Sequence, residues 1–190
     1  MSSQTNTYLT PEEYLAIERQ AEYRSEYFNG GMFAMTGASR KHNLITLNTG
    51  AELRACLRES PCEVYVSDMR VGVVATSLYT YPDVVVVCGE PKFEDERVDT
   101  LINPVLLVEV LSESTESYDR GKKFSYYRTI ESLAEYLLVA QDEHKIEQYN
   151  KQVDGRWLLT DIRGLDAAVE LVSVQCSLGL KEIYDKVALH

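Results

Sequence analysis

The sequence predicts an α/β fold in which a central mixed sheet is flanked by helices. Runs rich in β-branched residues follow one another between residues 63 and 111, and helical patterns precede and follow them. No internal repeat, linker or low-complexity segment interrupts the chain, and 190 residues are enough for one hydrophobic core. We therefore expect a single domain over residues 1–190.

The N-terminal segment is expected to form a helix and then a hairpin. In Thr10-Pro-Glu-Glu13, Thr10 can cap a helix, the proline stands at the first helical position, and the Glu13 side chain can bond back to the backbone N–H of Thr10. This pattern predicts a helix from residue 11 to about residue 21. Asn29-Gly30 tolerates the positive φ angles of a two-residue turn, so segments 25–28 and 31–35 are predicted to pair.

A long amphipathic helix is predicted over residues 41–58, and strands follow it. The apolar residues near one face of this helix are Leu44, Leu47, Ala51, Ala55 and Leu57. The predicted strands cover residues 63–67, 69–74, 84–88 and 105–111. The acidic segment 89–103 contains Pro91, which favours a surface loop.

The C-terminal half repeats the alternation of helix and strand. A helix is predicted over residues 118–130, and strands are predicted over residues 136–140, 145–149 and 157–162. Residues 153–156 have the composition of a turn between the last two of these strands. A short helix over residues 180–187 is expected to close the fold.

Composition restricts the function classes and the location. The formal charge of −11 argues against tight, non-specific binding of nucleic acid, although it is compatible with a nuclease whose carboxylates gather around a metal. The sequence has neither an apolar stretch long enough to span a membrane nor a signal-peptide pattern. We therefore expect no association with a membrane and a cytoplasmic location. The cysteines have no C-x-x-C spacing, and reduced, buried thiols are expected for Cys56, Cys62, Cys88 and Cys176.

Two acids stand in apolar runs that read as buried strands. Asp83 opens the run 81–88, and Glu109 interrupts the run 104–111. A buried carboxylate without a partner costs several kcal/mol, so each acid should have a cation, a metal or hydrogen-bond donors beside it. Asp83 alone is more typical of a turn cap, and the structural alternative for Glu109 is a buried ion pair with Lys123 or an arginine.

A lysine on the following helix is predicted to point inward. At 100° per residue, Lys123 falls in the middle of the arc formed by Asp119, Tyr126, Tyr127 and Ile130, while Lys122 falls toward Ser125 and Thr129. An inward lysine requires a carboxylate or a polar cleft. Asp119, four residues before Lys123, is expected to orient it rather than to bind metal.

Strand carboxylates beside a lysine suit metal-assisted hydrolysis of a phosphoester. Mg²⁺ or Mn²⁺ binds one or two carboxylates together with water and substrate phosphate, and it activates the attacking water. The lysine would deprotonate that water or stabilise the negative charge that develops on the phosphate.

At these residues the chain resembles the PD-(D/E)XK nuclease superfamily, and within it a bacterial family of restriction-endonuclease-like proteins long catalogued as a domain of unknown function. The segments that support the resemblance are Glu26–Ser39 with His42, Pro82–Val87, Val108–Thr115, Asp119–Phe124 with Tyr127-Arg128, and Glu135–Val139. The resemblance implies a restriction-endonuclease-like core, DNA as substrate and a homodimer.

The resemblance also implies roles for individual residues. Asp83 and Glu109 would be metal ligands together with the backbone carbonyl of Val110, and Glu26 would be an acid supplied by the N-terminal hairpin. The usual lysine position of the superfamily, two residues after the acid, is Leu111 here. Lys123 would replace that lysine from the neighbouring helix, as in other branches of the superfamily.

His42 is a weaker accessory candidate, since a histidine near a helix start more often caps or packs than catalyses.

The sequence supports a Mg²⁺- or Mn²⁺-dependent endonuclease as the first hypothesis. A nuclease-fold domain without catalysis, which acts as a binding or regulatory module, is the second hypothesis, because of Leu111 and the negative charge. Hydrolysis of a smaller phosphoester is the third.

Overall fold

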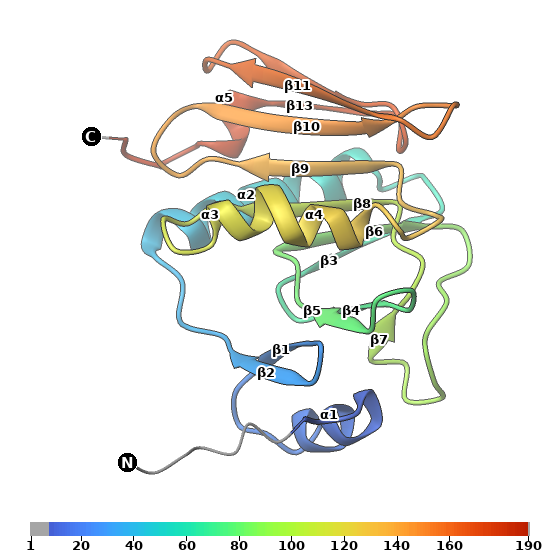
Figure 1. The fold of residues 1–190 in the computed structure, drawn as a ribbon. Helices are drawn as coiled ribbons and strands as arrows, with labels where there is room; N and C mark the ends of the chain where they lie inside the picture. The colour runs from blue at the N-terminus through green and yellow to red at the C-terminus, as the bar shows by residue number, and fades with distance from the viewer. Residues whose placement is uncertain (1–7, 190) are drawn as a thin grey trace.

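The computed structural model describes residues 8–189, and a six-stranded sheet forms its centre (Figure 1). The strands of this sheet are β3 (Cys62–Val66), β6 (Val84–Cys88), β8 (Leu106–Val110), β9 (Glu135–Val139), β10 (Lys145–Lys151) and β11 (Trp157–Arg163). Their order is β11-β10-β9-β8-β6-β3. β8 and β9 run parallel and the other neighbours are antiparallel, so the sheet is mixed, as predicted.

A second sheet has the order β2-β1-β5-β4-β7. It consists of β1 (Ser25–Phe28), β2 (Gly31–Ala34), β4 (Arg70–Val73), β5 (Leu78–Thr80) and β7 (Thr100–Leu101). A small third sheet pairs β12 (Ala168–Leu171) with β13 (Cys176–Gly179). The predicted N-terminal hairpin is therefore confirmed, and it forms one end of the second sheet.

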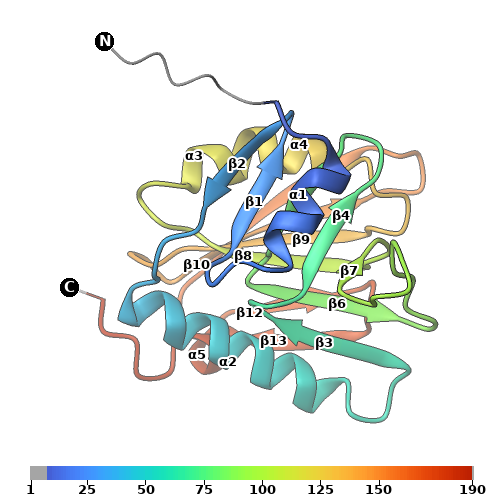
Figure 2. The ribbon, with the colours of Figure 1, turned by 90° about the horizontal axis from the view of Figure 1, so that it is seen from below.

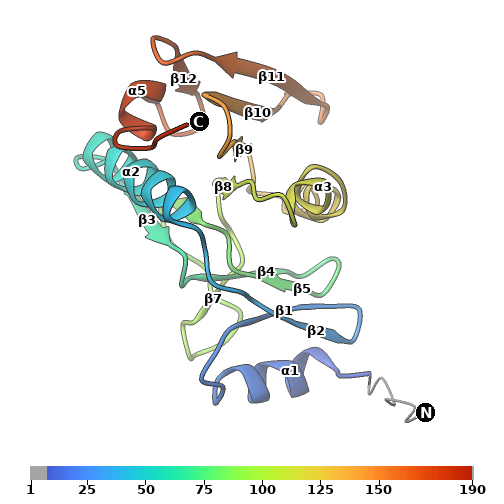
Figure 3. The same ribbon diagram turned by 90° about the vertical axis from the view of Figure 1, so that its left-hand side faces the viewer.

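Helices cover both faces of the six-stranded sheet. The helices are α1 (Pro11–Glu18), α2 (Arg40–Cys56), α3 (Glu116–Tyr118), α4 (Phe124–Tyr127) and α5 (Leu180–Ile183), and a π-helical segment, η1 (Asp119–Lys123), joins α3 to α4. Viewed along the sheet, α2 and the α3–α4 segment lie on opposite sides of β8 (Figure 3). α1 lies against the far side of the second sheet (Figures 1 and 3). No helix within residues 8–189 is long and apolar enough to cross a membrane.

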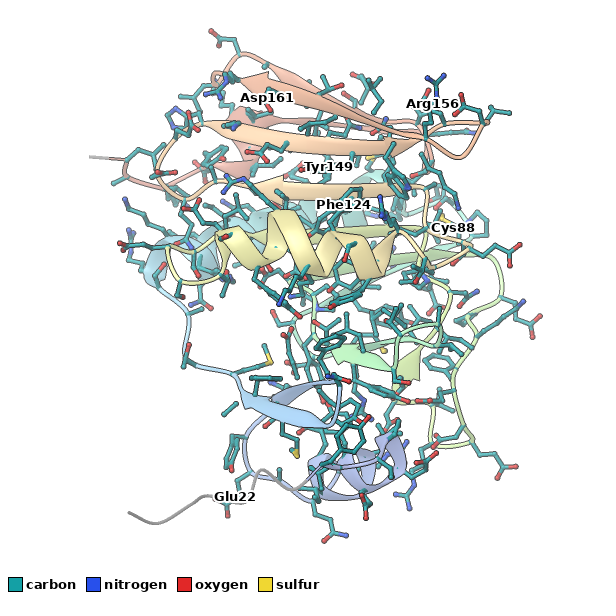
Figure 4. All side chains as sticks on the ribbon, in the orientation of Figure 1. Glu22, Cys88, Phe124, Tyr149, Arg156 and Asp161 are labelled. Carbon is teal, nitrogen blue, oxygen red and sulfur yellow. A yellow bond between two sulfur atoms is a disulfide. The ribbon has the colours of Figure 1, made fainter. Side chains whose placement is uncertain are left out.

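The central strands are apolar on both faces because both faces are covered. Val84, Val86 and Val108 pack with α2 and α5 in one buried cluster. Val85 and Leu107 point the other way, into a cluster with Tyr127 and the α4 side. Phe124 on α4 meets Tyr149 on β10 at a ring separation of 4.3 Å, and the two side chains are neighbours in Figure 4.

The buried face of α2 differs from the predicted one. Leu47 is 64% exposed, whereas Ile45 and Leu53 are fully buried. A Cβ on Gly50 would lie 2.6 Å from Val66 Cγ1, so the helix lies close to the end of β3 at this glycine. An apolar periodicity count gives no weight to Gly50, although this glycine is on the buried face of the helix.

Other boundaries also depart from the expectations. The helix predicted over 118–130 is divided by η1, α1 ends at Glu18, and α5 ends at Ile183. The short strands β5, β7, β12 and β13 were not predicted, and β7 lies in the segment expected to be a loop. Each of these strands has four residues or fewer, and its existence depends on pairing with a distant segment.

The expectation of reduced cysteines is wrong in this structure. Cys62 lies opposite Cys88 in the antiparallel register of β3 and β6, and the two form a disulfide with Cα atoms 4.0 Å apart. Cys56 at the end of α2 pairs with Cys176 on β13, with Cα atoms 6.1 Å apart. Both pairings join segments that are distant in the chain, 26 and 120 residues apart, and the spacing of the cysteines does not reveal which segments meet.

The observed face of α2 predicts unequal effects of one substitution at two positions. Leu53→Ala should lower the free energy of unfolding by about 2–5 kcal/mol, because it opens a cavity against the sheet. Leu47→Ala on the same helix should change it by less than about 0.5 kcal/mol. Urea denaturation of both variants measures the difference, and an equal loss at the two positions would contradict the observed orientation.

Candidate active site

Asp83 and Glu109 are brought together by the antiparallel pairing of β6 and β8. Val84 is the register partner of Val108, so Asp83, one residue before β6, stands beside Glu109. The N–H of Val110 donates a hydrogen bond to Asp83 Oδ2 at 2.7 Å. The two acids that the sequence singled out therefore lie at the same end of adjacent strands.

Lys123 lies among the acids, as the helical periodicity predicted. Its Nζ is 2.8 Å from Glu109 Oε1, 3.1 Å from Glu26 Oε1 and 3.6 Å from Asp119 Oδ1. The side chain is only 6% exposed, whereas Lys122 is exposed to solvent. In η1, Asp119 and Lys123 are both directed to the buried side. The arrangement brings together Glu26, Glu109, Asp119 and Lys123.

Tyr127 and Thr80 complete this arrangement as a closed ring of side-chain contacts. Tyr127 donates its hydroxyl hydrogen to Glu109 Oε1 at 2.8 Å, and its hydroxyl lies 3.3 Å from that of Thr80. Thr80 in turn donates to Glu26 Oε1. Sequence reasoning gave neither residue a role. Tyr127 could have been found, because it shares the inward arc with Lys123, but Thr80 lies in the short strand β5.

His42 lies at the edge of the cluster. Its Nε2 is 3.2 Å from Asp83 Oδ2, and its Nδ1 is 3.4 Å from the hydroxyl of Thr46 on the next turn of α2. The start of α2 is held in place by Ser39, which caps the helix. These contacts bring the accessory candidate His42 next to Asp83.

Gln141 ties the start of α2 to the end of β8. Its amide donates to the carbonyl oxygen of Leu111 at 2.6 Å, and it accepts a hydrogen bond from the hydroxyl of Ser39 at 2.6 Å. The sequence analysis did not identify Gln141. Its contact connects two segments that are far apart in the chain, and no local pattern marks such a contact.

The cluster contains more carboxylates than cations. Burial raises the pKa of Glu109 well above its ordinary value, although the Lys123 ammonium opposes the shift. Burial also raises the pKa of Asp119, again against Lys123. Burial alone would lower the pKa of Lys123, but the carboxylates of Glu109, Glu26 and Asp119 outweigh it and raise that pKa well above its usual range. Lys123 is therefore held as an ammonium ion.

Each strand acid offers one oxygen to a ligand. The contacts to Glu109 fall on Oε1, and those to Asp83 fall on Oδ2. Within residues 8–189, this leaves Glu109 Oε2 and Asp83 Oδ1 without a protein donor. No group of three or more histidine, cysteine or acidic side chains in this part of the chain is arranged to enclose a metal ion. A pair of carboxylate oxygens still fits Mg²⁺, which commonly takes one or two carboxylates and fills its remaining positions with water and phosphate.

The cluster opens into a cleft of about 1010 Å³. The cleft is bounded by β2, the segment 35–39, the start of α2, the end of β8 and the α3–η1 segment. Figure 2 shows the hairpin β1–β2 on the same side of the molecule as α3 and α4. Glu26, Asp83, Glu109 and Lys123 all line this cleft, so a ligand that enters it meets the whole acid–lysine cluster.

The mixed sheet covered by helices, with two acids beside a helix-borne lysine, agrees with the expectation drawn from the resemblance to restriction-endonuclease-like proteins. The family model Uma2, described as "Putative restriction endonuclease", matches residues 11–181. The chain belongs to this family, which confirms the resemblance inferred from the sequence. Membership supports a nuclease-like function.

Two relatives and one solved structure resemble the chain over most of its length. It is 42% identical to the uncharacterized protein sll1609 of Synechocystis sp. over 166 residues, which are 87% of this chain and 94% of that protein. It is 38% identical to slr1290 of the same organism over 180 residues, 95% of this chain and 93% of that protein. The crystal structure of a "putative nuclease belonging to DUF820" from Anabaena variabilis superimposes with a TM-score of 0.78 at 18% identity and covers 95% of this chain and 99% of that one. This likeness shows a shared fold.

The charge imbalance predicts a pH-dependent effect of Glu109→Gln on the metal-free protein. A folded-state pKa above the ordinary value of 4.5 means that the stability linked to Glu109 is complete below that value and is lost as the pH rises through the raised pKa. Gln cannot lose a proton, so the melting temperature of the variant, relative to that of the parent, should increase as the pH rises. Thermal melts in EDTA across the acidic and neutral range measure this gain.

Glu59→Gln, at an exposed position, is the matched control and should follow the parent curve at every pH. A constant difference between Glu109→Gln and the parent across the whole range would show that the buried cluster does not carry the excess charge.

Proposed function

We propose that this protein is a Mg²⁺- or Mn²⁺-dependent endonuclease that hydrolyses DNA phosphodiester bonds. The observation that supports the proposal is the pair of acids on adjacent strands, each with one free oxygen at the same cleft, next to a lysine held as an ammonium ion. The proposal includes a homodimer and a cytoplasmic location, for which the sequence expectations are the support.

Each residue of the site would have its own role in the reaction. Asp83 and Glu109 would hold the metal, with the carbonyl of Val110 as a further ligand. The bound ion would supply an activated water and neutralise phosphate charge. Lys123 would stabilise the negative charge that develops on the phosphate, because its raised pKa makes it a poor base. Glu26 and Asp119 would orient the ammonium, and His42 would hold Asp83.

A nicking assay on supercoiled plasmid DNA with Mg²⁺ or Mn²⁺ tests the assignment. The parent protein should convert supercoiled DNA to open circles, and Asp83→Ala and Glu109→Ala should each abolish nicking, because the metal loses one of its two carboxylates. Thermal melts should show that both variants remain folded. Nicking that survives in both variants would remove the assignment.

The two neighbouring lysines offer an internal control. Lys123→Met should lower the rate constant of nicking by about 10²-fold or more, because a preorganised charge at the developing phosphate charge is lost. Lys122→Met should leave the rate within a factor of about two, since this side chain faces solvent. Single-turnover rates at saturating metal measure both effects. Equal losses of rate in the two variants would exclude a catalytic role that is specific to Lys123.

A non-catalytic binding or regulatory module remains the second candidate. The observation that favours it is Leu111, which occupies the usual lysine position with a buried, apolar side chain. Calorimetric titration with Mn²⁺ separates the two functions. Binding that disappears in Glu109→Gln supports an intact metal site, and the absence of binding to the parent supports the module.

A further inference from the structure

One wall of the cleft is apolar and exposed. Phe33 on β2 is 59% exposed and Met35, just after this strand, is 40% exposed, and both line the cleft. Tyr118 on α3 lines it as well. The acid–lysine cluster leaves these side chains without a role. Large apolar side chains that remain exposed inside a cleft are typical of ligand contact.

Phe33 stands directly beside the acid cluster. It is the register partner of Glu26 in the pairing of β1 with β2, and directly opposed residues on neighbouring strands project to the same face. A Cβ built on Gly31 would lie 3.2 Å from ring atoms Cε2 and Cζ of Phe33, so the ring lies over the backbone at Gly31. The glycine leaves room for this ring position, and Phe33 remains 59% exposed.

The cleft has few cations with which to grip a duplex. Among the described residues that line it, the lysines and arginines are Arg24 and Lys123. Lys123 is engaged by carboxylates, and Arg24 pairs with Asp68 at 2.9 Å. The lining carboxylates are Glu26, Asp83, Glu109, Glu113 and Asp119. Lys and Arg contact the phosphates of duplex and single-stranded DNA alike, but a single strand has the lower charge density and also gains stacking energy on an accessible aromatic ring.

We propose that Phe33 is a stacking platform for an unpaired nucleobase, and that the substrate class is single-stranded DNA or an unpaired segment within a duplex. The proposal rests on the proposed nuclease function. In an intact duplex both faces of a base are covered by its neighbours, so Phe33 would gain no stacking without extrusion of the base. An unpaired nucleotide places its base on Phe33 while its phosphate lies at the carboxylate pair.

The test compares DNA substrates of one sequence: a single strand, a blunt duplex and a duplex with a central unpaired bubble, each labelled at its 5′ end. With Mn²⁺ and the full-length protein, the single strand and the bubble should be cut, and the duplex should be cut at least about tenfold more slowly. Phe33→Ala should lower kcat/KM on the single strand about tenfold and leave the slow rate on the duplex unchanged. Phe33→Trp should restore cutting of the single strand.

Tyr23→Ala is the matched control, because Tyr23 is a 66% exposed aromatic residue that does not line the cleft. It should leave all three rates unchanged. Equal rates on single strand and duplex, or an equal loss on both in Phe33→Ala, would overturn the proposal.

Binding without turnover separates this inference from the nuclease assignment. Fluorescence anisotropy in Ca²⁺ should show that the parent binds the single strand more tightly than the duplex and that Phe33→Ala loses this preference. Binding of this kind without cutting of any substrate would refute the nuclease function and retain the stacking platform. No preference for the single strand would overturn the platform, whatever the cutting rates are.

Discussion

The structure depends on one buried ammonium ion that is shared between two sheets. Lys123 comes from η1, Glu109 from the six-stranded sheet and Glu26 from the second sheet, and the lysine lies 2.8 Å and 3.1 Å from their carboxylate oxygens. Burying the Lys123 ammonium alone would cost several kcal/mol, so it requires these carboxylates. The ring through Tyr127 and Thr80 gives further hydrogen-bond partners to the same oxygens.

The turn that carries Asp119 and Lys123 is π-helical. Asp119 and Lys123 are both buried although the intervening residues, among them Gly121 and Lys122, are exposed or half-buried. A wider turn of this kind interrupts the regular helix and is frequent at functional sites. Here it brings two oppositely charged side chains of one turn to the acid strands, while α4 continues with Phe124 and Tyr127 packed on the sheet side.

The sequence was sufficient for the parts of the site that local chemistry marks. An acid in an apolar strand is costly without a partner, so Asp83 and Glu109 could be singled out, and helical periodicity separated Lys123 from Lys122. The contributions of Thr80 and Gln141 could not be predicted, because they depend on a three-residue strand and on a contact across 30 residues. The predictions of the buried face of α2 and of reduced cysteines were wrong for the same reason. Both features depend on which distant segment of the chain packs against α2 or against each cysteine.

The position of Leu111 affects how relatives of this chain can be detected. Its side chain is 5% exposed and belongs to the apolar cluster beneath α4, so β8 continues its packing at the point where the superfamily usually has its lysine. In the proposed assignment, a cation supplied by a helix would separate the demands of packing from those of charge. A database pattern that requires an acid and a lysine two residues apart would overlook this chain. A profile that pairs an acid in an apolar strand with an inward lysine on the next helix would retrieve it.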